Sequence, residues 1–300
     1  MATDGAPEPG HTTERIDPAY YLSTRSDAFL YACHLASYDF VLDLARDRRV
    51  LDFGCGTGYG TARLADAAAS IIGVDVSPEV IDVARDRFDL PGLDFRTIRP
   101  VEAEPLPFAD GAFDVVLSFQ VYEHLVDPSA YLAEAVRVLA ADGTLVCITP
   151  DRDSRLLPRQ RPWNRFHVRE YSQSELRADL EPHFGSVEVA GMSADAGLLQ
   201  LELRRYRRVK WLAAPVTFPG VPEAVRTRGL RALQRLDRRR GAVAVESASG
   251  RMDDFGVGPE DVDVFTTRRP SLHVVAVARA PRRAQVRTAP SSSPASSRSR

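Results

Sequence analysis

The 300-residue chain has few cysteines and no long apolar run. Its three cysteines, Cys33, Cys55 and Cys147, are scattered, and their spacing matches neither a metal site nor a disulfide framework. No segment reaches the length of a membrane span. Residues 1–17 carry Pro, Glu and Asp in place of a basic region followed by an apolar stretch. We therefore expect a soluble, cytoplasmic protein with reduced thiols and no signal peptide.

Neither positive nor negative charge is in large excess, because the formal net charge is only -2. The chain as a whole is therefore not a polycation, and nothing in its composition demands a nucleic-acid partner. Its length is sufficient to bury a complete α/β core and to leave residues for a lid or appendage.

The most informative stretch is residues 50–60, in which an apolar strand leads through Asp52 into a glycine-rich turn and then a helix. The glycines alternate along the turn: Gly54, Gly56, Gly58 and Gly60. A dinucleotide fingerprint would need a third glycine where Tyr59 stands, and no lysine follows as a phosphate loop would require. The carboxylate of Asp52 would repel a pyrophosphate and attract ammonium and sulfonium groups. The loop therefore predicts a nucleoside cofactor that carries positive charge.

A second strand is expected at residues 71–75 and ends in Asp75, about twenty residues after the loop. Ser77 is a good N-cap and Pro78 suits the first position of a helix. The strand must then end at Asp75, which places this carboxylate at the carboxyl edge of a parallel sheet. There it can accept hydrogen bonds from both hydroxyls of a ribose.

These features resemble the class I S-adenosylmethionine-dependent methyltransferases. The first motif of that family has the form hydrophobic-hydrophobic-Asp/Glu-x-Gly-x-Gly-x-Gly, which residues 50–58 match. The resemblance implies a Rossmann-like, doubly wound α/β fold with a mostly parallel seven-stranded sheet and helices on both faces. It also implies S-adenosylmethionine as cofactor. The turn at residues 108–114, the strand at 115–118 and the helix, turn and strand over 128–148 resemble later motifs of the family.

The resemblance implies roles for individual residues. Asp52 and the loop glycines would cradle the methionine end of the cofactor, and Asp75 would bind its ribose. Glu102 fits, by count before Leu-Pro-Phe, the position of an acidic residue that accepts from the adenine amino group; the alternative is an exposed loop charge. The complete predicted cofactor-binding set is Tyr38, Asp52, Gly54, Cys55, Gly56, Gly58, Asp75, Val76, Glu102 and Ser118.

Within the family, the chain is most similar to a methyltransferase type 11-like subgroup associated with glycan biosynthesis. Two segments, residues 33–38 and 164–171, carry this resemblance, which extends over residues 18–192. His34 and Tyr38 match the subgroup, whereas Cys33 stands where it has Glu and Ser37 where it has Arg.

His124 is the predicted general base, because imidazole titrates near neutrality and this residue follows the strand at 115–118. The alternative is that His124 only caps or packs a helix start. Glu123 would orient His124 or bind substrate hydroxyls, or else face water. Some relatives have an acidic metal ligand three residues before this pair; here that residue is Gln120, so we expect no metal.

Residues 163–171 are expected to cross the carboxyl edge of the sheet. His167 and Arg169 are candidates for substrate binding, with His167 as a second catalytic residue. The alternative is a structural role, with Arg169 paired to Glu170 or another carboxylate. Trp163 and Tyr171 would offer flat apolar faces to a sugar ring.

Composition divides the chain into five parts: a flexible arm at residues 1–18, the cofactor-binding core at 19–192, a basic and partly helical insertion or lid at 193–270, a last core strand at 271–280 and a disordered tail at 281–300. Within the core, helices are expected at 26–46, 128–140 and 172–183. Strands at 186–190 and 272–278 would form a final hairpin-like pair.

The insertion is strongly basic between residues 204 and 240, with twelve Lys and Arg against Glu223 and Asp237, a local charge of about +10. Residues 222–240 can form a helix with leucines on one side and arginines elsewhere. Three interpretations remain open: a solvated helix packed on the core, a surface for anionic membrane or a lipid-linked substrate at the inner membrane face, and, least favoured, a nucleic-acid contact.

The sequence thus predicts a methyltransferase that acts on a hydroxyl of a saccharide or glycan intermediate. One alternative is a small-molecule O- or N-methyltransferase with a phenolic, quinone or amine acceptor. An alternative of another class is a non-catalytic cofactor-binding module that docks on a membrane or partner.

Overall fold

The computed structural model describes residues 24–241 and 255–282, without the side chains of 234–241. The expected arm at residues 1–18 and nearly all of the expected tail at 281–300 lie outside these ranges.

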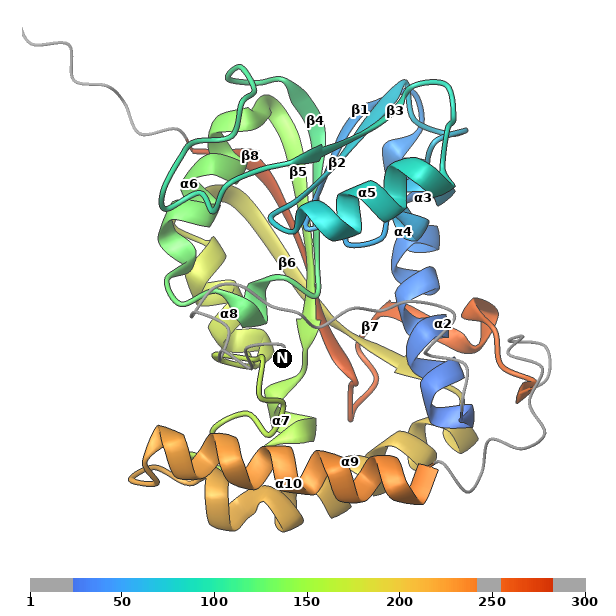
Figure 1. Ribbon diagram of the computed structural model, residues 1–300. Coiled ribbons are helices and arrows are strands. Elements are labelled where there is room, and N and C mark those ends of the chain that lie inside the picture. Colours follow the sequence, from blue (N-terminus) through green and yellow to red (C-terminus); the bar gives the residue numbers. More distant parts are fainter. Residues whose placement is uncertain (1–23, 242–254, 283–300) are drawn as a thin grey trace, which may run out of the picture.

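The described chain is built on one eight-stranded sheet with the order β3-β2-β1-β4-β5-β8-β6-β7 (Figure 1). Strands β1 to β5 pair in parallel, whereas β8 is antiparallel to both β5 and β6. The predicted doubly wound, mostly parallel α/β fold is therefore confirmed. The strands are β1 Arg49–Phe53, β2 Ser70–Asp75, β3 Leu93–Thr97, β4 Phe113–Phe119, β5 Leu139–Pro150, β6 Phe184–Ala194, β7 Val262–Thr266 and β8 His273–Pro281.

The sheet has eight strands in the described part of the chain, one more than predicted. Strand β7 comes from the far end of the expected insertion and pairs antiparallel with β6, Ala194 lying opposite Val262. It covers the backbone N–H and C=O groups that β6 would otherwise present at the edge of the sheet. The predicted pairing of the last two core strands is confirmed by β6 and β8.

Helices cover both faces of the sheet. They are α2 Arg25–Phe40, α3 Leu42–Ala45, α4 Tyr59–Arg63, α5 Pro78–Arg87, α6 Pro128–Val138, α7 Arg152–Arg155, α8 Gln173–Leu180, α9 Ala196–Thr217 and α10 Glu223–Gly241, with short 3-10 turns η1 Tyr122–His124 and η3 Pro259–Asp261. Alternate residues of β4 enter different cores: Val115 and Leu117 pack with α2, whereas Val116 packs with α6 and α8. This period of two is what a strand buried on both faces requires.

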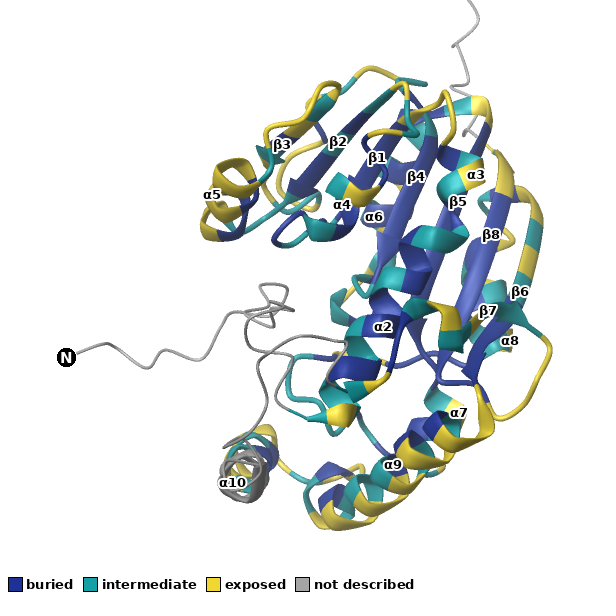
Figure 2. Cartoon of the chain, turned by 90° about the vertical axis from the view of Figure 1, so that its right-hand side faces the viewer, coloured by how far each residue is buried: buried dark blue, intermediate teal, exposed yellow. Residues whose placement is uncertain are grey.

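Helices α9 and α10 lie side by side beyond the carboxyl end of β5, and we refer to residues 196–241 as the α9–α10 hairpin (Figures 1 and 2). Helix α7, which follows β5, contacts α9. The start of α10 is tied to the core, because the Arg226 guanidinium donates to the carbonyl of Pro162 (2.9 Å) and Arg161 pairs with Glu223 (3.1 Å). Among the described residues, no helix is both long and apolar enough to cross a membrane.

Candidate cofactor pocket and active site

The glycine loop leaves β1 and turns over the end of β2. The amides of Gly54 and Cys55 both donate to the carbonyl of Val74, at 2.8 and 3.0 Å. Gly56 has a positive φ of 53°, and a Cβ built there would meet no atom within 4 Å. Its position thus leaves open space beside a backbone that only glycine adopts readily, which allows a ligand to approach closely.

Asp75 ends β2 and is held at the rim of this loop. Its Oδ2 accepts from the amide of Gly56 (3.1 Å), and its Oδ1 accepts from the amide of Ser77 (2.9 Å). Strand β2 and the Ser77-Pro78 helix start therefore fix the carboxylate at the carboxyl edge, as the sequence predicts.

A cavity of about 560 Å³ opens between the loop, the ends of β2 and β4, and η1. This is the size of a small-molecule site. Seven of the ten predicted cofactor residues line it: Tyr38, Gly54, Cys55, Gly56, Asp75, Val76 and Glu102. Glu102 is exposed at this cavity.

Asp52 lies below the loop and does not line the cavity. It is fully buried; its Oδ2 accepts from the hydroxyls of Thr61 (2.6 Å) and Tyr38 (3.1 Å), while its Oδ1 has no hydrogen-bond partner within the described part of the chain. Burial raises the pKa of Asp52 to about 6, although the bonds from Thr61 and Tyr38 oppose the shift. Asp52 thus ties the end of β1 to α4 through Thr61 and to α2 through Tyr38.

Ser118 and Gly58 also lie outside the cavity lining. Ser118 is buried, and its Oγ is 2.9 Å from the Tyr131 hydroxyl, which donates to the carbonyl of Phe53 (3.1 Å). Gly58 has a positive φ of 74°, and a Cβ there would lie 2.6 Å from the ring of Phe95. Both residues therefore support the lining from behind.

Several residues of the lining are not among the predicted cofactor residues, including Tyr59, Ile98, Gln120 and Tyr131. Gln120 was weighed only as a metal-ligand position. It directly follows β4 with a positive φ of 56°, so its position at a strand's carboxyl end was the signal that would have identified it.

His124 lies in η1 and lines the cavity. Its Nδ1 is 3.1 Å from the carbonyl oxygen of Phe166. Because a carbonyl can only accept, Nδ1 carries the proton of the neutral ring and the lone pair lies on Nε2. This tautomer suits a general base.

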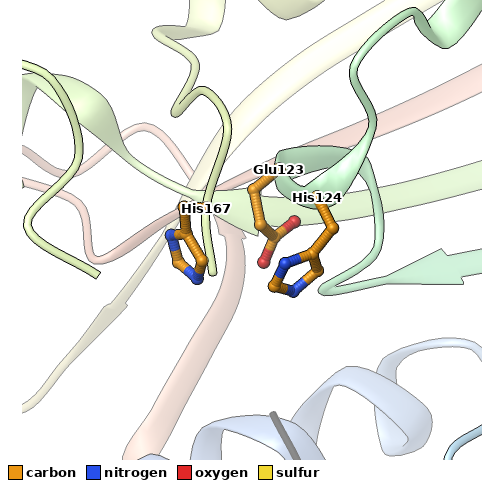
Figure 3. A group of neighbouring side chains, drawn as sticks. All are labelled: Glu123, His124 and His167. Atoms are coloured by element: carbon orange, nitrogen blue, oxygen red, sulfur yellow. The ribbon is translucent and has the colours of Figure 1, made fainter. Parts of the chain in front are cut away.

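Glu123 is buried beside His124 (Figure 3). Its Oε2 accepts from the hydroxyl of Thr149 (2.9 Å), and its Oε1 has no hydrogen-bond partner in the described segments. Its backbone carbonyl accepts from the amide of Val168 (2.8 Å), which ties the crossing segment to η1. The structure therefore excludes the alternative in which Glu123 faces water.

His167 lies next to His124, with the rings edge to face and their centroids 5.1 Å apart, but it does not line the cavity. Its Nδ1 is 2.8 Å from Oε1 of Glu170, and its Nε2 is 2.8 Å from the Asn164 amide. Glu170 also binds Arg155 at 3.0 Å. Burial alone would raise the pKa of Glu170, but Arg155 and His167 outweigh it and lower this pKa to about 2.

This buried network reaches His124 through the backbone. The side-chain oxygen of Asn164 accepts from the amide of Phe166 (3.1 Å), and the carbonyl of Phe166 binds His124. His167 and Glu170 therefore hold the segment that sets the orientation of His124.

Glu123, His124 and His167 also bring ligand atoms within 4.8 Å of one another, a spacing that can hold a metal ion. The two nitrogens of His167 are already bonded to Glu170 and Asn164. A metal at this cluster would have to displace one of those bonds, so the cluster carries no metal assignment.

Other residues of the crossing segment are placed differently from expectation. Arg169 pairs with Glu175 (3.2 Å), and Glu170 pairs with Arg155 instead. Tyr171 is buried, so the prediction that its ring offers a face to a sugar is wrong. The sequence pattern could not show this burial, because aromatic residues are typical of both cores and sugar sites.

Comparison with known proteins is consistent with this geometry. Residues 51–147 match the family described as "Methyltransferase domain". A relative from Mycolicibacterium smegmatis, named "Probable S-adenosylmethionine-dependent methyltransferase", is 37% identical over 172 residues, covering 57% of this chain and 65% of the relative. A "Ubiquinone biosynthesis O-methyltransferase" from Cereibacter sphaeroides is 39% identical over 107 residues, covering 36% of this chain and 43% of the relative. The chain thus spans less than two thirds of the length of these relatives.

Among solved structures, the YcgJ protein from Bacillus subtilis aligns with a TM-score of 0.47 and 19% identity, over 83% of this chain and 98% of that one. The sequence matches show that residues 51–147 are similar to a methyltransferase domain and that the chain is similar to S-adenosylmethionine-dependent methyltransferases, in agreement with the Rossmann-like sheet order.

Proposed function

We propose that the protein transfers a methyl group from S-adenosylmethionine to a hydroxyl, most specifically that of a saccharide or glycan intermediate, with His124 as the general base. The observation that carries the proposal is the position of His124 in the cavity lining just after β4, with its Nδ1 bonded to the carbonyl of Phe166.

The residues around the cavity fit the cofactor. The open space at Gly56 admits a ligand to the backbone, and the Asp75 carboxylate at the rim suits ribose hydroxyls. Glu102 lines the same cavity and can accept from an amino group. When bound, S-adenosylmethionine supplies a methyl carbon activated by a positively charged sulfur.

The protein's own task is to align the acceptor and to remove its proton. His124 takes the hydroxyl proton at Nε2 and becomes an imidazolium. The Glu123 carboxylate lies beside this ring, with an oxygen within 4.8 Å of a nitrogen of His124. The Phe166 carbonyl and the network behind it keep the ring in place.

Two observations support a saccharide acceptor. The segments at 33–38 and 164–171 resemble those of glycan-associated methyltransferases. The cavity lining also includes the polar side chains of Gln120 and Asp127, which suit a polyhydroxylated ligand. The buried state of Cys33, Cys55 and Cys147 as free thiols supports placing the protein in the cytoplasm.

A second candidate acceptor is a phenol or quinone. The similarity of residues in the methyltransferase domain to the ubiquinone-biosynthesis relative favours it. A non-catalytic module, in contrast, would bind the cofactor tightly without turnover.

The test is methyl transfer from labelled S-adenosylmethionine to a panel of glucosides, oligosaccharides, lipid-linked glycans and phenols, with cofactor binding measured by calorimetry. We expect labelled saccharide. Labelled phenol in place of saccharide would establish the second candidate. Cofactor binding without any labelled product would favour the non-catalytic module, and absence of binding would contradict the assignment.

A further inference from the structure

The outward side of α9 carries apolar and basic side chains together. At about 100° per residue, Leu201, Arg204, Trp211 and Leu212 fall within an arc of about 100°, with Trp211 and Leu212 at its two edges. All four are exposed, and Trp211 and Leu212 are 62% and 52% exposed. The exposed parts of α9 can be followed in Figure 2.

The opposite side of α9 is the one that packs on the protein. Leu198, Glu202, Tyr206, Ala213 and Thr217 are buried there. Helix α9 is therefore packed on the protein, and Trp211 is exposed because it lies on the other side of this helix. Leu212 and Trp211 belong to a second surface.

Exposed apolar residues are also present in the turn and at the start of α10. Phe218 follows directly after α9 and is 39% exposed, and Val225 in α10 is 50% exposed. We define the hairpin surface as the exposed residues Leu201, Arg204, Arg207, Trp211, Leu212, Phe218, Val225 and Arg228.

On α9 the exposed charges have one sign, whereas at the start of α10 the exposed Glu223 is paired with Arg161 and Arg226. The only acidic residue of α9 is Glu202, which is buried and bonded to Arg205 at 2.8 Å. The exposed charges of α9 are arginines, among them Arg204 and Arg207. A positive surface with exposed Trp and Leu has the composition of an interfacial helix, whose apolar groups enter the headgroup boundary while arginines meet anionic lipid.

We propose that the hairpin surface docks on an anionic phospholipid membrane. The positive charge favours lipid phosphate over a neutral partner, and the exposed Trp211 and Leu212 supply the apolar insertion that a purely electrostatic contact would not need. The hairpin lies beyond the carboxyl end of β5, on the side of the sheet where the cavity opens. This inference concerns a different surface from the proposed active site and does not depend on it.

The test uses the full chain with vesicles of phosphatidylcholine alone, or with about 30% phosphatidylglycerol, in sedimentation at low and high salt. We expect binding only to the anionic vesicles, weaker at high salt, with a blue shift of tryptophan emission. Arg204→Gln combined with Arg207→Gln should weaken partitioning about 30-fold, roughly 5-fold for each charge. Trp211→Ala should weaken binding and abolish most of the emission shift.

Matched controls lie on α5 and just after it, away from the hairpin. Arg87 and Leu90 are exposed, and we expect Arg87→Gln and Leu90→Ser to bind vesicles like the unmodified chain. Absence of binding to anionic vesicles, or equal binding by the Arg204/Arg207 variant, would overturn the proposal. Loss of a dimer in Trp211→Ala, with no vesicle binding by either protein, would assign the surface to a second copy of the chain and likewise overturn it.

Discussion

A single residue, Asp75, binds the backbone of the glycine loop and also lines the cofactor cavity. Its two carboxylate oxygens accept from the amides of Gly56 and Ser77, so its position depends on backbone on both sides. A carboxylate fixed in this way can bind ribose hydroxyls without first being ordered, which reduces the entropic cost of binding.

We predict that Asp75→Ala weakens binding of S-adenosylmethionine by about 10- to 100-fold, because the net loss of one hydrogen bond to a charged group costs about 1.5–3 kcal/mol. Calorimetry measures the change. Asp94→Ala is the matched control, since Asp94 lies on the neighbouring strand β3 outside the cavity lining. Equal affinity of Asp75→Ala and the unmodified protein would refute the ribose role.

Glu170 belongs to the network behind His124, and its replacement tests that network. Glu170 is buried and paired with Arg155, so Glu170→Gln leaves a buried guanidinium without its counter-charge. We predict a loss of about 3–5 kcal/mol in the free energy of unfolding at pH 7. Glu188→Gln, which removes an exposed partner of Arg279, should change it by less than about 1 kcal/mol.

The pH dependence follows from the same residue. The folded-state pKa of Glu170 is lowered from an ordinary 4.5 to about 2, so its stabilisation is present above pH 4.5 and is lost as the pH falls toward 2. The destabilisation by Glu170→Gln should therefore shrink between these pH values in urea titrations. A difference that stays constant down to pH 2 would contradict the lowered pKa.

Local sequence could predict the positions of Asp75 and His124, because Asp75 ends one apolar strand and His124 follows soon after another, both at the carboxyl edge of the sheet. Local sequence could not predict whether a side chain lines the cavity or is buried in the core. Asp52 and Ser118 lie within strands and were expected at the cofactor, but their side chains point into the cores toward Thr61 and Tyr131. Which side of a strand is covered depends on helices distant in sequence, so a motif cannot reveal it.

Among the secondary-structure elements, α8 shows most directly how local sequence sets a boundary. The Ser172 side chain accepts from the amide of Glu175, and the Glu175 side chain accepts from the amide of Ser172, a complete capping box. The predicted helix start is confirmed. Two apolar residues, Leu176 and Leu180, then bury the inward face of the helix.

Removing this cap should destabilise the protein. We predict that Ser172→Ala lowers the free energy of unfolding by about 1 kcal/mol, because an amide at the helix start loses its acceptor. Ser172→Thr retains a hydroxyl and serves as the control. Urea unfolding that gives the same midpoint for Ser172→Ala and the unmodified chain would show that the cap contributes nothing.

Elements that depend on long-range pairing were harder to predict. Strand β7 is short and its position is set by the edge of β6, about seventy residues earlier in the chain. Strand β5 begins at Leu139, where a helix was expected to continue to residue 140, because Leu139 pairs with Phe113 before a register shift in β4. Such pairings are tertiary contacts that local periodicity does not contain.

At the level of the described chain, the cofactor cavity and the α9–α10 hairpin arise from different connections of the sheet. The carboxyl ends of β1, β2 and β4 form the cofactor cavity, while the connection from β6 to β7 supplies the α9–α10 hairpin. Residues 162–168 link them, since the amide of Val168 donates to Glu123 in η1 and the carbonyl of Pro162 accepts from Arg226 in the hairpin. The exposed residues of the hairpin surface lie outside the cavity lining, so the proposed membrane contact can be altered without replacing a lining residue.

The role of His124 as general base is tested most directly by the methyl-transfer rate of His124→Gln. This rate is measured on the best acceptor found in the panel, with cofactor binding measured on the same preparation. We predict that turnover falls at least ~100-fold while cofactor affinity stays within about twofold, because Gln keeps polarity but cannot take the proton. His183→Gln, a histidine outside the cavity lining, should retain full activity. Unchanged turnover in His124→Gln would contradict the central claim that His124 is the general base.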